Sequence, residues 1–320
     1  MEHRKIGKSD IYVAPLAFGG NVFGWTLDER KSFEILDAFV ASGFNFIDTA
    51  DVYSRWAPGN HGGESETIIG KWMKERGNRN HVVIATKVGG DMGQGKRELS
   101  RIHIRKAVED SLKRLQTDYI DLYQSHYDDP GTPMGETLET YMQLVREGKV
   151  RITGASNFTK ERLAQSLEIS EKNGYPLYQT LQPLYNLYDR EVFEKELEPF
   201  CLKHSIGVLN YYSLASGFLS GKYRSESDLG KSARGAGNKK YLNEKGFAIL
   251  AALDEVAARY QCTPATIAIA WLLARPSVTA PIASATDVDQ LRSLVRATEI
   301  KLDKDSIDLL NSAGDRKETI

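Results

Sequence analysis

Short apolar runs alternate with amphipathic stretches along the whole chain. One such stretch, Arg101–Leu115, places Ile104, Val108 and Leu112 on one stripe, as an α-helix does, and Ser100 is suited to cap it. Thr263 and Pro264 predict another helix start. Eight apolar runs are predicted as buried strands: Leu16–Phe18, Asn45–Asp48, Val82–Lys87, Tyr119–Ser125, Arg151–Ala155, Tyr178–Gln182, Ile206–Asn210 and Val278–Ile282.

The spacing of these runs predicts the fold class. From the second to the seventh run, the starts are roughly 27 to 37 residues apart, which fits one strand, one helix and their loops. Nearly continuous apolar strands separated by helices indicate a parallel sheet covered on both faces. We therefore expect an α/β protein, a (β/α)8 TIM barrel forming one domain over residues 1–320. A doubly wound open sheet is the alternative, but no GxGxxG fingerprint follows the first run.

Two segments stand outside this repeat. Residues 4–14 predict an N-terminal β-hairpin with its turn at 7–10, placed to close the bottom of the barrel. After the seventh strand, residues 221–246 form a long insertion with seven Lys or Arg, three acidic residues and five glycines. This insertion is either a solvated, mobile surface loop or a basic flap that covers a phosphate-bearing ligand.

Composition and charge exclude several classes of partner. The chain has 42 basic and 43 acidic residues and a net charge of −1, so it has no broad field for nucleic acid or an anionic membrane. The uncharged segment 261–274 is too short to span a bilayer. Two cysteines, Cys201 and Cys262, suit a reducing compartment, and the charged N-terminus lacks a signal region. We therefore expect a cytoplasmic protein without a metal site.

Candidate chemistry lies where the apolar runs end, because barrel active sites lie at the carboxyl ends of the strands. Asp48, Lys87 and His126 end or follow three successive runs, and Tyr53 lies in the loop after Asp48. Each residue alone has an ordinary structural explanation, such as a cap, a surface charge or a core histidine. Together they suit proton donation by a tyrosine: an ammonium beside the phenol favours the phenolate, and Asp48 would hold that ammonium.

The chain resembles the aldo-keto reductases, most closely the bacterial members related to the potassium-channel β subunits. The matching stretches follow the family order through nearly the whole chain: GFNFIDTADVYS (43–54), GGESETIIGKWMK (62–74), VVIATKVG (82–89), DSLKRLQTDYIDLYQSHYDDP (110–130), LVREGKVRITGASNF (144–158), LQPLYNL (181–187), LASGFLSGKY (214–223) and PIASATDVDQL (281–291). The resemblance implies a catalytic tetrad of Asp48, Tyr53, Lys87 and His126. It also implies reduction of an aldehyde or ketone by NADPH, with hydride from the nicotinamide and a proton from Tyr53.

The resemblance further implies where the cofactor binds. Ser156, Asn157 and Gln182 match positions that hold the nicotinamide carboxamide, although Ser156 and Asn157 could instead cap a helix, and Tyr211 matches the aromatic residue that stacks on the ring. The remaining cofactor residues are Gly20 and Asn21 near the first strand, Leu214, Ala215 and Ser216 at the pyrophosphate, Lys222 and Arg234 in the basic insertion, and Ser284, Thr286 and Gln290 at the adenosine end.

Departures from the family pattern affect cofactor preference. Tyr212 and Ser213 replace the family's Ser-Pro after the seventh strand, Thr286 stands where many relatives have Arg, and Ser293-Leu294 replaces a Glu-Asn pair. NADH is therefore possible beside NADPH.

The aromatic residues Trp25, Trp56 and Tyr127 are the candidates for the substrate site, and Arg55 is a further polar option. A small carbonyl compound is the expected partner, and an oligomer is possible. One alternative is a cofactor-binding regulatory subunit with little turnover, as in channel β proteins, which His126 disfavours because they often lack this histidine. The other is a Schiff-base enzyme acting through Lys87.

Overall fold

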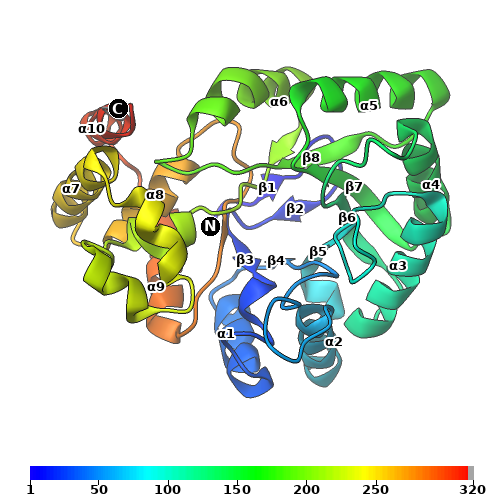
Figure 1. Ribbon diagram of the computed structural model, residues 1–320, viewed down its shortest axis with the longest axis horizontal. Coiled ribbons are helices and arrows are strands. Elements are labelled where there is room, and N and C mark those ends of the chain that lie inside the picture. Colours follow the sequence, from blue (N-terminus) through cyan, green and yellow to red (C-terminus); the bar gives the residue numbers. More distant parts are fainter. Residues whose placement is uncertain (316–320) are drawn as a thin grey trace.

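A computed structural model describes residues 1–315 of the chain. One sheet contains eight parallel strands in the order β10-β3-β4-β5-β6-β7-β8-β9. This is their order along the chain, except that the last strand, β10, lies beside the first, β3. Figure 1 shows this sheet curled, with helices on its outside. The strands are β3 (Ala17–Gly19), β4 (Phe46–Asp48), β5 (Val83–Val88), β6 (Ile120–Ser125), β7 (Val150–Ser156), β8 (Tyr178–Gln182), β9 (Gly207–Val208) and β10 (Ile282–Ala283).

Several helices begin at a residue whose side chain caps them. Ser100 Oγ accepts from the His103 N–H at the start of α3, and Thr263 caps α8, as predicted. Within residues 1–315 no helix has the length and apolarity needed to cross a membrane. The α-helices are α1 (Glu29–Ala41), α2 (Glu64–Arg76), α3 (Arg101–Leu115), α4 (Met134–Arg146), α5 (Lys160–Asn173), α6 (Glu198–His204), α7 (Glu244–Arg259), α8 (Pro264–Leu273), α9 (Val288–Arg296) and α10 (Lys304–Gly314).

The last predicted strand lies elsewhere than expected. The prediction was Val278–Ile282, whereas β10 covers Ile282–Ala283. The residues before β10 run beside β9 instead: the Thr279 N–H donates to the Val208 carbonyl at 2.8 Å, and the Ile282 N–H donates to the Asn210 carbonyl at 3.0 Å. The apolar run therefore forms hydrogen bonds first with the segment that contains β9 and then, as β10, pairs with β3.

The predicted N-terminal hairpin is present as β1 (Arg4–Lys5) and β2 (Tyr12–Val13), paired antiparallel. It lies against the amino ends of the strands. The Lys8 N–H donates to Gln179 Oε1 at 2.8 Å, and Asn45 Oδ1 accepts from the Ala14 N–H at 2.9 Å. Figure 1 shows the hairpin across the middle of the curled sheet. Its buried side chains Ile6, Ile11 and Val13 pack against this end of the sheet.

The inner face of the curled sheet carries apolar side chains toward the amino ends of the strands and polar side chains toward their carboxyl ends. Side chains alternate along a strand, so Val83, Ala85 and Lys87 of β5 point to the same side. Phe46, Val83 and Ala85 join the hairpin side chains in one buried apolar cluster at the amino end. Toward the carboxyl end, the same face carries polar residues that are also buried, namely Asp48, Lys87, Gln124 and Gln182.

The insertion at 221–246 is ordered and packed. It contains the short 3-10 segments η5 (Glu226–Lys231) and η6 (Gly235–Tyr241) and then begins α7. Tyr223 and Tyr241 are buried, and Tyr241 stacks on Phe218 with ring centroids 5.2 Å apart. Its tyrosines contribute to the core, whereas more than half of its residues, among them Lys222, Lys239 and Lys240, are exposed to solvent.

Candidate active site

Three of the four candidate catalytic residues form one hydrogen-bonded cluster. Lys87, near the end of β5, donates from Nζ to Asp48 Oδ2, to the Thr49 carbonyl and to the Tyr53 hydroxyl, each at 2.8 Å. The Tyr53 hydroxyl also lies 3.2 Å from Asp48 Oδ2. Asp48 and Lys87 have no exposed surface, so their ion pair lies in a low-dielectric environment.

This environment keeps the phenol protonated. Burial raises the pKa of Tyr53 well above its ordinary value, and the nearby Asp48 carboxylate raises it further. Burial lowers the pKa of Lys87, which the same carboxylate opposes. We expected the ammonium to lower the pKa of Tyr53, but burial and Asp48 outweigh it. Tyr53 therefore holds its proton at neutral pH and can act as an acid.

His126 completes the cluster from β6. Its ring centroid lies 6.1 Å from that of Tyr53, and its backbone N–H donates to the Val88 carbonyl at 2.8 Å. Burial and the cations Lys87 and Arg97 hold the pKa of His126 well below its ordinary value. The imidazole is therefore neutral near pH 7, and its Nδ1 is buried with no hydrogen-bond partner among the described residues.

The residues expected at the nicotinamide carboxamide lie together beside this cluster. Gln182 Nε2 donates to Asp48 Oδ1 at 2.9 Å, and Ser156 Oγ donates to the Gln182 carbonyl at 2.8 Å. The Tyr211 hydroxyl donates to Asn157 Oδ1 at 2.8 Å. Ser156 and Asn157 do not cap α5, because Thr159 does. The structural alternative for this pair is therefore wrong.

The loop after β9 adopts an unusual backbone. Tyr212, Ala215 and Ser216 have positive φ angles of 55°, 46° and 56°, which side chains other than glycine rarely adopt. Leu214 packs against the core, and its carbonyl accepts from the Gly217 and Leu219 N–H groups at 2.8 and 3.2 Å. Lys222 lies close by, since a Cβ on Gly217 would be 3.5 Å from its Nζ. This bend turns the chain back toward the carboxyl ends of the strands.

Arg234 joins the insertion to the loop after β3. The amide of Asn21 links two neighbours: its nitrogen donates to Ser284 Oγ at 2.7 Å, and its oxygen accepts from Arg234 Nη2 at 2.7 Å. The Arg234 guanidinium carbon lies 5.2 Å from the ring centroid of Trp25. Gly20, beside Asn21, is buried, and a Cβ there would approach Ser65 Oγ to 2.9 Å. The insertion therefore reaches over to the residues predicted near the first strand.

Two of the residues expected at the adenosine end, Thr286 and Gln290, contact each other. The backbone N–H and hydroxyl of Thr286 both lie 3.1 Å from Gln290 Oε1. The Asp287 carboxylate caps α9 by accepting from the Gln290 N–H at 2.8 Å. A helix N-terminus favours an anion, and here a carboxylate of the chain already holds that position. This arrangement disfavours a second anion at the same point.

Aromatic residues form one wall of the site. Trp25 and Trp56 meet edge to face with ring centroids 5.6 Å apart, and Trp56 lies 6.0 Å from Tyr53 in the same way. On the other side, Tyr127 stacks on His126 with centroids 4.5 Å apart and planes inclined by 11°. All three predicted substrate residues thus adjoin the cluster directly or through one ring.

Several groups in or near this cluster were not predicted from the sequence. The Thr49 carbonyl is a backbone group, so no residue type could indicate its contact with Lys87. Glu66, in the first turn of α2, is fully buried and accepts from Arg114 at 2.7 Å and from Thr86 at 2.6 Å. Asp51 is also buried, and neither of its carboxylate oxygens has a partner among the described residues. The signal available in the sequence was the position of Asp51, three residues after Asp48 in the stretch DTADVYS (48–54).

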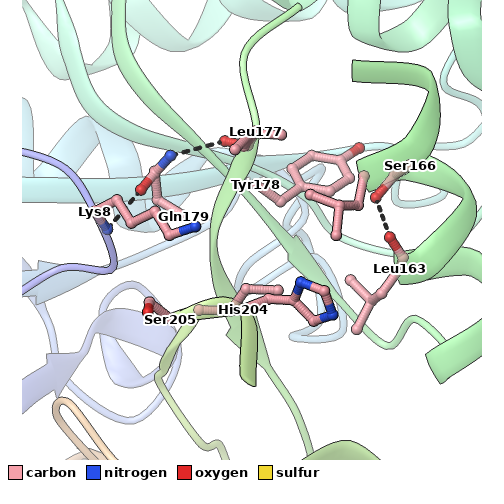
Figure 2. Close-up of a pocket in the computed structure, with 10 residues that line it drawn as sticks. Lys8, Leu163, Ser166, Leu177, Tyr178, Gln179, His204 and Ser205 are labelled. Carbon is pink, nitrogen blue, oxygen red and sulfur yellow. Dashed lines mark hydrogen bonds between the residues drawn. The ribbon is translucent and has the colours of Figure 1, made fainter. Parts of the chain in front are cut away.

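A separate pocket lies at the opposite end of the strands. Figure 2 shows it between α5, the start of β8 and the end of α6, beside the hairpin turn at Lys8. Its polar groups bond to one another: Gln179 accepts from the Lys8 N–H, and Ser166 Oγ donates to the Leu163 carbonyl at 2.8 Å. The pocket lies at the end of the strands remote from Asp48, Tyr53 and Lys87.

Comparison with known proteins gives one consistent result. A sequence model of the aldo/keto reductase family matches residues 15–315. The chain is 37% identical to the "Uncharacterized oxidoreductase YrpG" of Bacillus subtilis over 97% of its own length and 95% of the relative. It is 36% identical to the "Aldo-keto reductase YhdN" of the same organism, over 92% and 86% of the two chains. It is 31% identical to a "Probable voltage-gated potassium channel subunit beta" of Arabidopsis thaliana, over 94% and 92%.

Proposed function

The chain belongs to the aldo/keto reductase family of oxidoreductases, and we propose that it reduces an aldehyde or ketone to an alcohol with NADPH, Tyr53 being the general acid. One observation carries this proposal: the Lys87 ammonium lies 2.8 Å from both the Tyr53 hydroxyl and Asp48 Oδ2. A buried cation held against a protonated phenol is suited to stabilise the phenolate that proton donation leaves behind.

We also infer that the sheet is a closed (β/α)8 barrel and that the chain is one domain. The hydrogen bonds from residues 279 and 282 to β9 support closure, since β10 also pairs with β3. One group of buried apolar residues extends from Ala14 to Ala313, which supports a single domain. In this arrangement residues 221–246 cover the mouth next to the cofactor.

The residues present fit a nicotinamide dinucleotide. Arg234 is largely buried, yet no carboxylate pairs with it within residues 1–315, which suits a ligand phosphate. Lys222 and the bend at 214–216 lie on the same side. Asn157 and Gln182 offer amide groups for a carboxamide, and the Tyr211 ring lies beside Asn157. When bound there, the nicotinamide would supply a hydride to the carbonyl carbon.

The chain's own residues would handle the proton. Tyr53 gives its proton to the carbonyl oxygen while the carbon gains the hydride, so the product is an alcohol and the tyrosine is left as phenolate. The Lys87 ammonium stabilises that phenolate, and Asp48, fixed by Gln182, keeps the ammonium in place. Neutral His126 can donate a hydrogen bond to the same oxygen and orient it. A proton from water then restores Tyr53.

The test is a fluorescence titration with NADPH and NADH side by side, followed by turnover of a panel of aldehydes and ketones. Tight binding with turnover supports the reductase. Tight binding with no turnover of any carbonyl compound favours the regulatory alternative, for which the likeness to the Arabidopsis channel subunit is the motivation. Binding of neither nucleotide overturns the proposal. The Asp287 cap leads us to expect a smaller advantage for NADPH than an arginine at 286 would give.

A further inference from the structure

We propose that the substrate is a carbonyl compound that carries a carboxylate, and that Arg97 binds this carboxylate. The inference rests on the proposed reductase function and specifies its substrate class. Its basis is a stack of three planar groups that leads outward from the catalytic cluster and ends in a cation.

The stack consists of His126, Tyr127 and Arg97. The imidazole and the Tyr127 ring are nearly parallel with centroids 4.5 Å apart, and the Arg97 guanidinium carbon lies 3.8 Å from the centroid of Tyr127. Since His126 already covers one face of Tyr127, the guanidinium must lie on the other face. Arg97 is therefore further from Tyr53 than the imidazole is, and it suits an anion at the end of the substrate remote from the carbonyl.

This guanidinium is exposed, lies on the Tyr127 ring and has no anionic partner among residues 1–315. Within the described part of the chain, Arg97 makes no ion pair, whereas the adjacent Lys96 pairs with Glu98 at 3.2 Å. The nearby carboxylates are already engaged: Glu98 also accepts from Ser100 at 2.7 Å, and Asp91 accepts from the Gly93 and Gly95 N–H groups. An arginine fixed on an aromatic ring keeps its planar edge free, and that edge matches the two oxygens of a carboxylate.

A second guanidinium lies at the same opening. Arg55, in the loop after β4, approaches the loop that carries Arg97: a Cβ on Gly93 would be 3.6 Å from its Nη2. Arg55 interacts with the Asp91 carboxylate and is one of the groups that lower its pKa. Arg55 therefore contributes less net positive charge to the opening than Arg97, and we assign the carboxylate to Arg97.

Trp25 and Trp56 provide an apolar surface beside Tyr53. Trp56 is 49% exposed, and it forms edge-to-face contacts with both Trp25 and Tyr53. A substrate in this opening would place an apolar, preferably aromatic, body against the tryptophans and its carboxylate at Arg97. The combination favours an aromatic or extended aldehyde acid over a neutral sugar or a short neutral aldehyde.

The test compares two substrates of nearly equal size, 4-carboxybenzaldehyde and methyl 4-formylbenzoate, in wild type and Arg97→Met with saturating NADPH. We expect wild type to show the higher kcat/KM for the acid, mainly through a lower KM. Arg97→Met should lower the acid-to-ester ratio about tenfold to a hundredfold, the usual worth of a charge-assisted hydrogen bond. Arg97→Lys should give an intermediate ratio, because it keeps the charge and loses the planar fork.

The matched control is Lys96→Met, which removes a neighbouring cation that already has a partner, and it should leave the ratio as in wild type. A readout without turnover is the quenching of tryptophan fluorescence by benzoate and by benzamide, where Arg97→Met should weaken benzoate binding alone. An ester reduced as well as the acid, with the same ratio in Arg97→Met, overturns this inference and leaves the reductase standing. Reduction of neither aldehyde by wild type, together with benzoate binding that depends on Arg97, counts against the proposed function and supports the anion site.

Discussion

Lys87 Nζ lies 2.8 Å from Asp48 Oδ2, and both side chains are fully buried at the carboxyl ends of adjacent strands. The carboxylate is held on its other oxygen by Gln182, and the ammonium is held by the Thr49 carbonyl. Every polar atom of this pair thus has a partner, which is what makes a buried ion pair tolerable. The relationship ties the stability of the interior of the curled sheet to the chemistry proposed at the carboxyl ends of its strands.

Lys87→Met should therefore abolish turnover and also destabilise the protein. It leaves the Asp48 carboxylate buried without its cation, at a cost of about 3–5 kcal/mol in the free energy of unfolding. The double variant Asp48→Asn, Lys87→Met should recover most of this stability, because the uncompensated charge is gone, but no activity. Urea unfolding and carbonyl reduction measure the two effects separately. Activity in the double variant would show that the ammonium is dispensable.

Tyr53→Phe should lower the rate of carbonyl reduction by roughly 10²–10⁴ fold, the usual worth of a positioned proton donor. The dissociation constant for NADPH should stay within about twofold, because the change removes one hydroxyl that faces Lys87 and Asp48. Tyr12→Phe is the control, since Tyr12 is exposed in the hairpin at the other end of the strands. Turnover at the wild-type rate in Tyr53→Phe would remove Tyr53 from the mechanism.

The sequence predicted that Asp48, Tyr53, Lys87 and His126 lie together, because each either ends an apolar run or follows one closely. Asp48 and Lys87 lie at or near the carboxyl ends of β4 and β5, and His126 directly follows β6, so one rule about strand ends found all three. The environment of Tyr53 could not be predicted in the same way. Its pKa depends on how completely the surroundings exclude water, which is a property of packing between segments far apart in the chain.

Packing between segments far apart in the chain also explains the other differences between the sequence predictions and the structure. The residues before β10 have the composition of a strand, but whether they pair with β9 or β3 depends on how the sheet curls. Glu66 has the position of a first-turn acid on α2, and only the approach of Arg114 from α3 makes it a buried ion pair. The insertion has a loop-like composition, and its two tyrosines become core residues only when the flanking helices are in place.

Arg234→Ala should weaken NADPH binding by about tenfold or more, since it removes a largely buried cation that has no acidic partner in residues 1–315. Lys239→Ala is the matched control, because Lys239 lies in the same insertion but is exposed and paired with Glu226. The loss should be larger at low ionic strength for both nucleotides if the contact is to a phosphate. An unchanged dissociation constant, measured by fluorescence titration, would remove Arg234 from the site.

Asp51 should make the stability of the protein depend on pH. Burial raises its pKa from 3.8 to about 8, and the neighbouring Glu66 adds to this effect. Between about pH 4 and pH 8 the folded protein keeps a proton that the unfolded chain releases, so the free energy of unfolding falls as the pH rises through this range. The fall from this group totals about 6 kcal/mol at most and ends above pH 8, where Asp51 is ionised in both states.

Asp51→Asn removes this titration without changing the shape of the side chain. Urea unfolding from pH 5 to pH 9 should show the variant gaining stability relative to wild type as the pH rises, with no further gain above pH 8. Asp118→Asn, at an exposed position after α3, should show no such trend. A constant difference between Asp51→Asn and wild type across this range would mean that Asp51 is ionised in the folded protein throughout, and hence that a cation or water reaches its carboxylate.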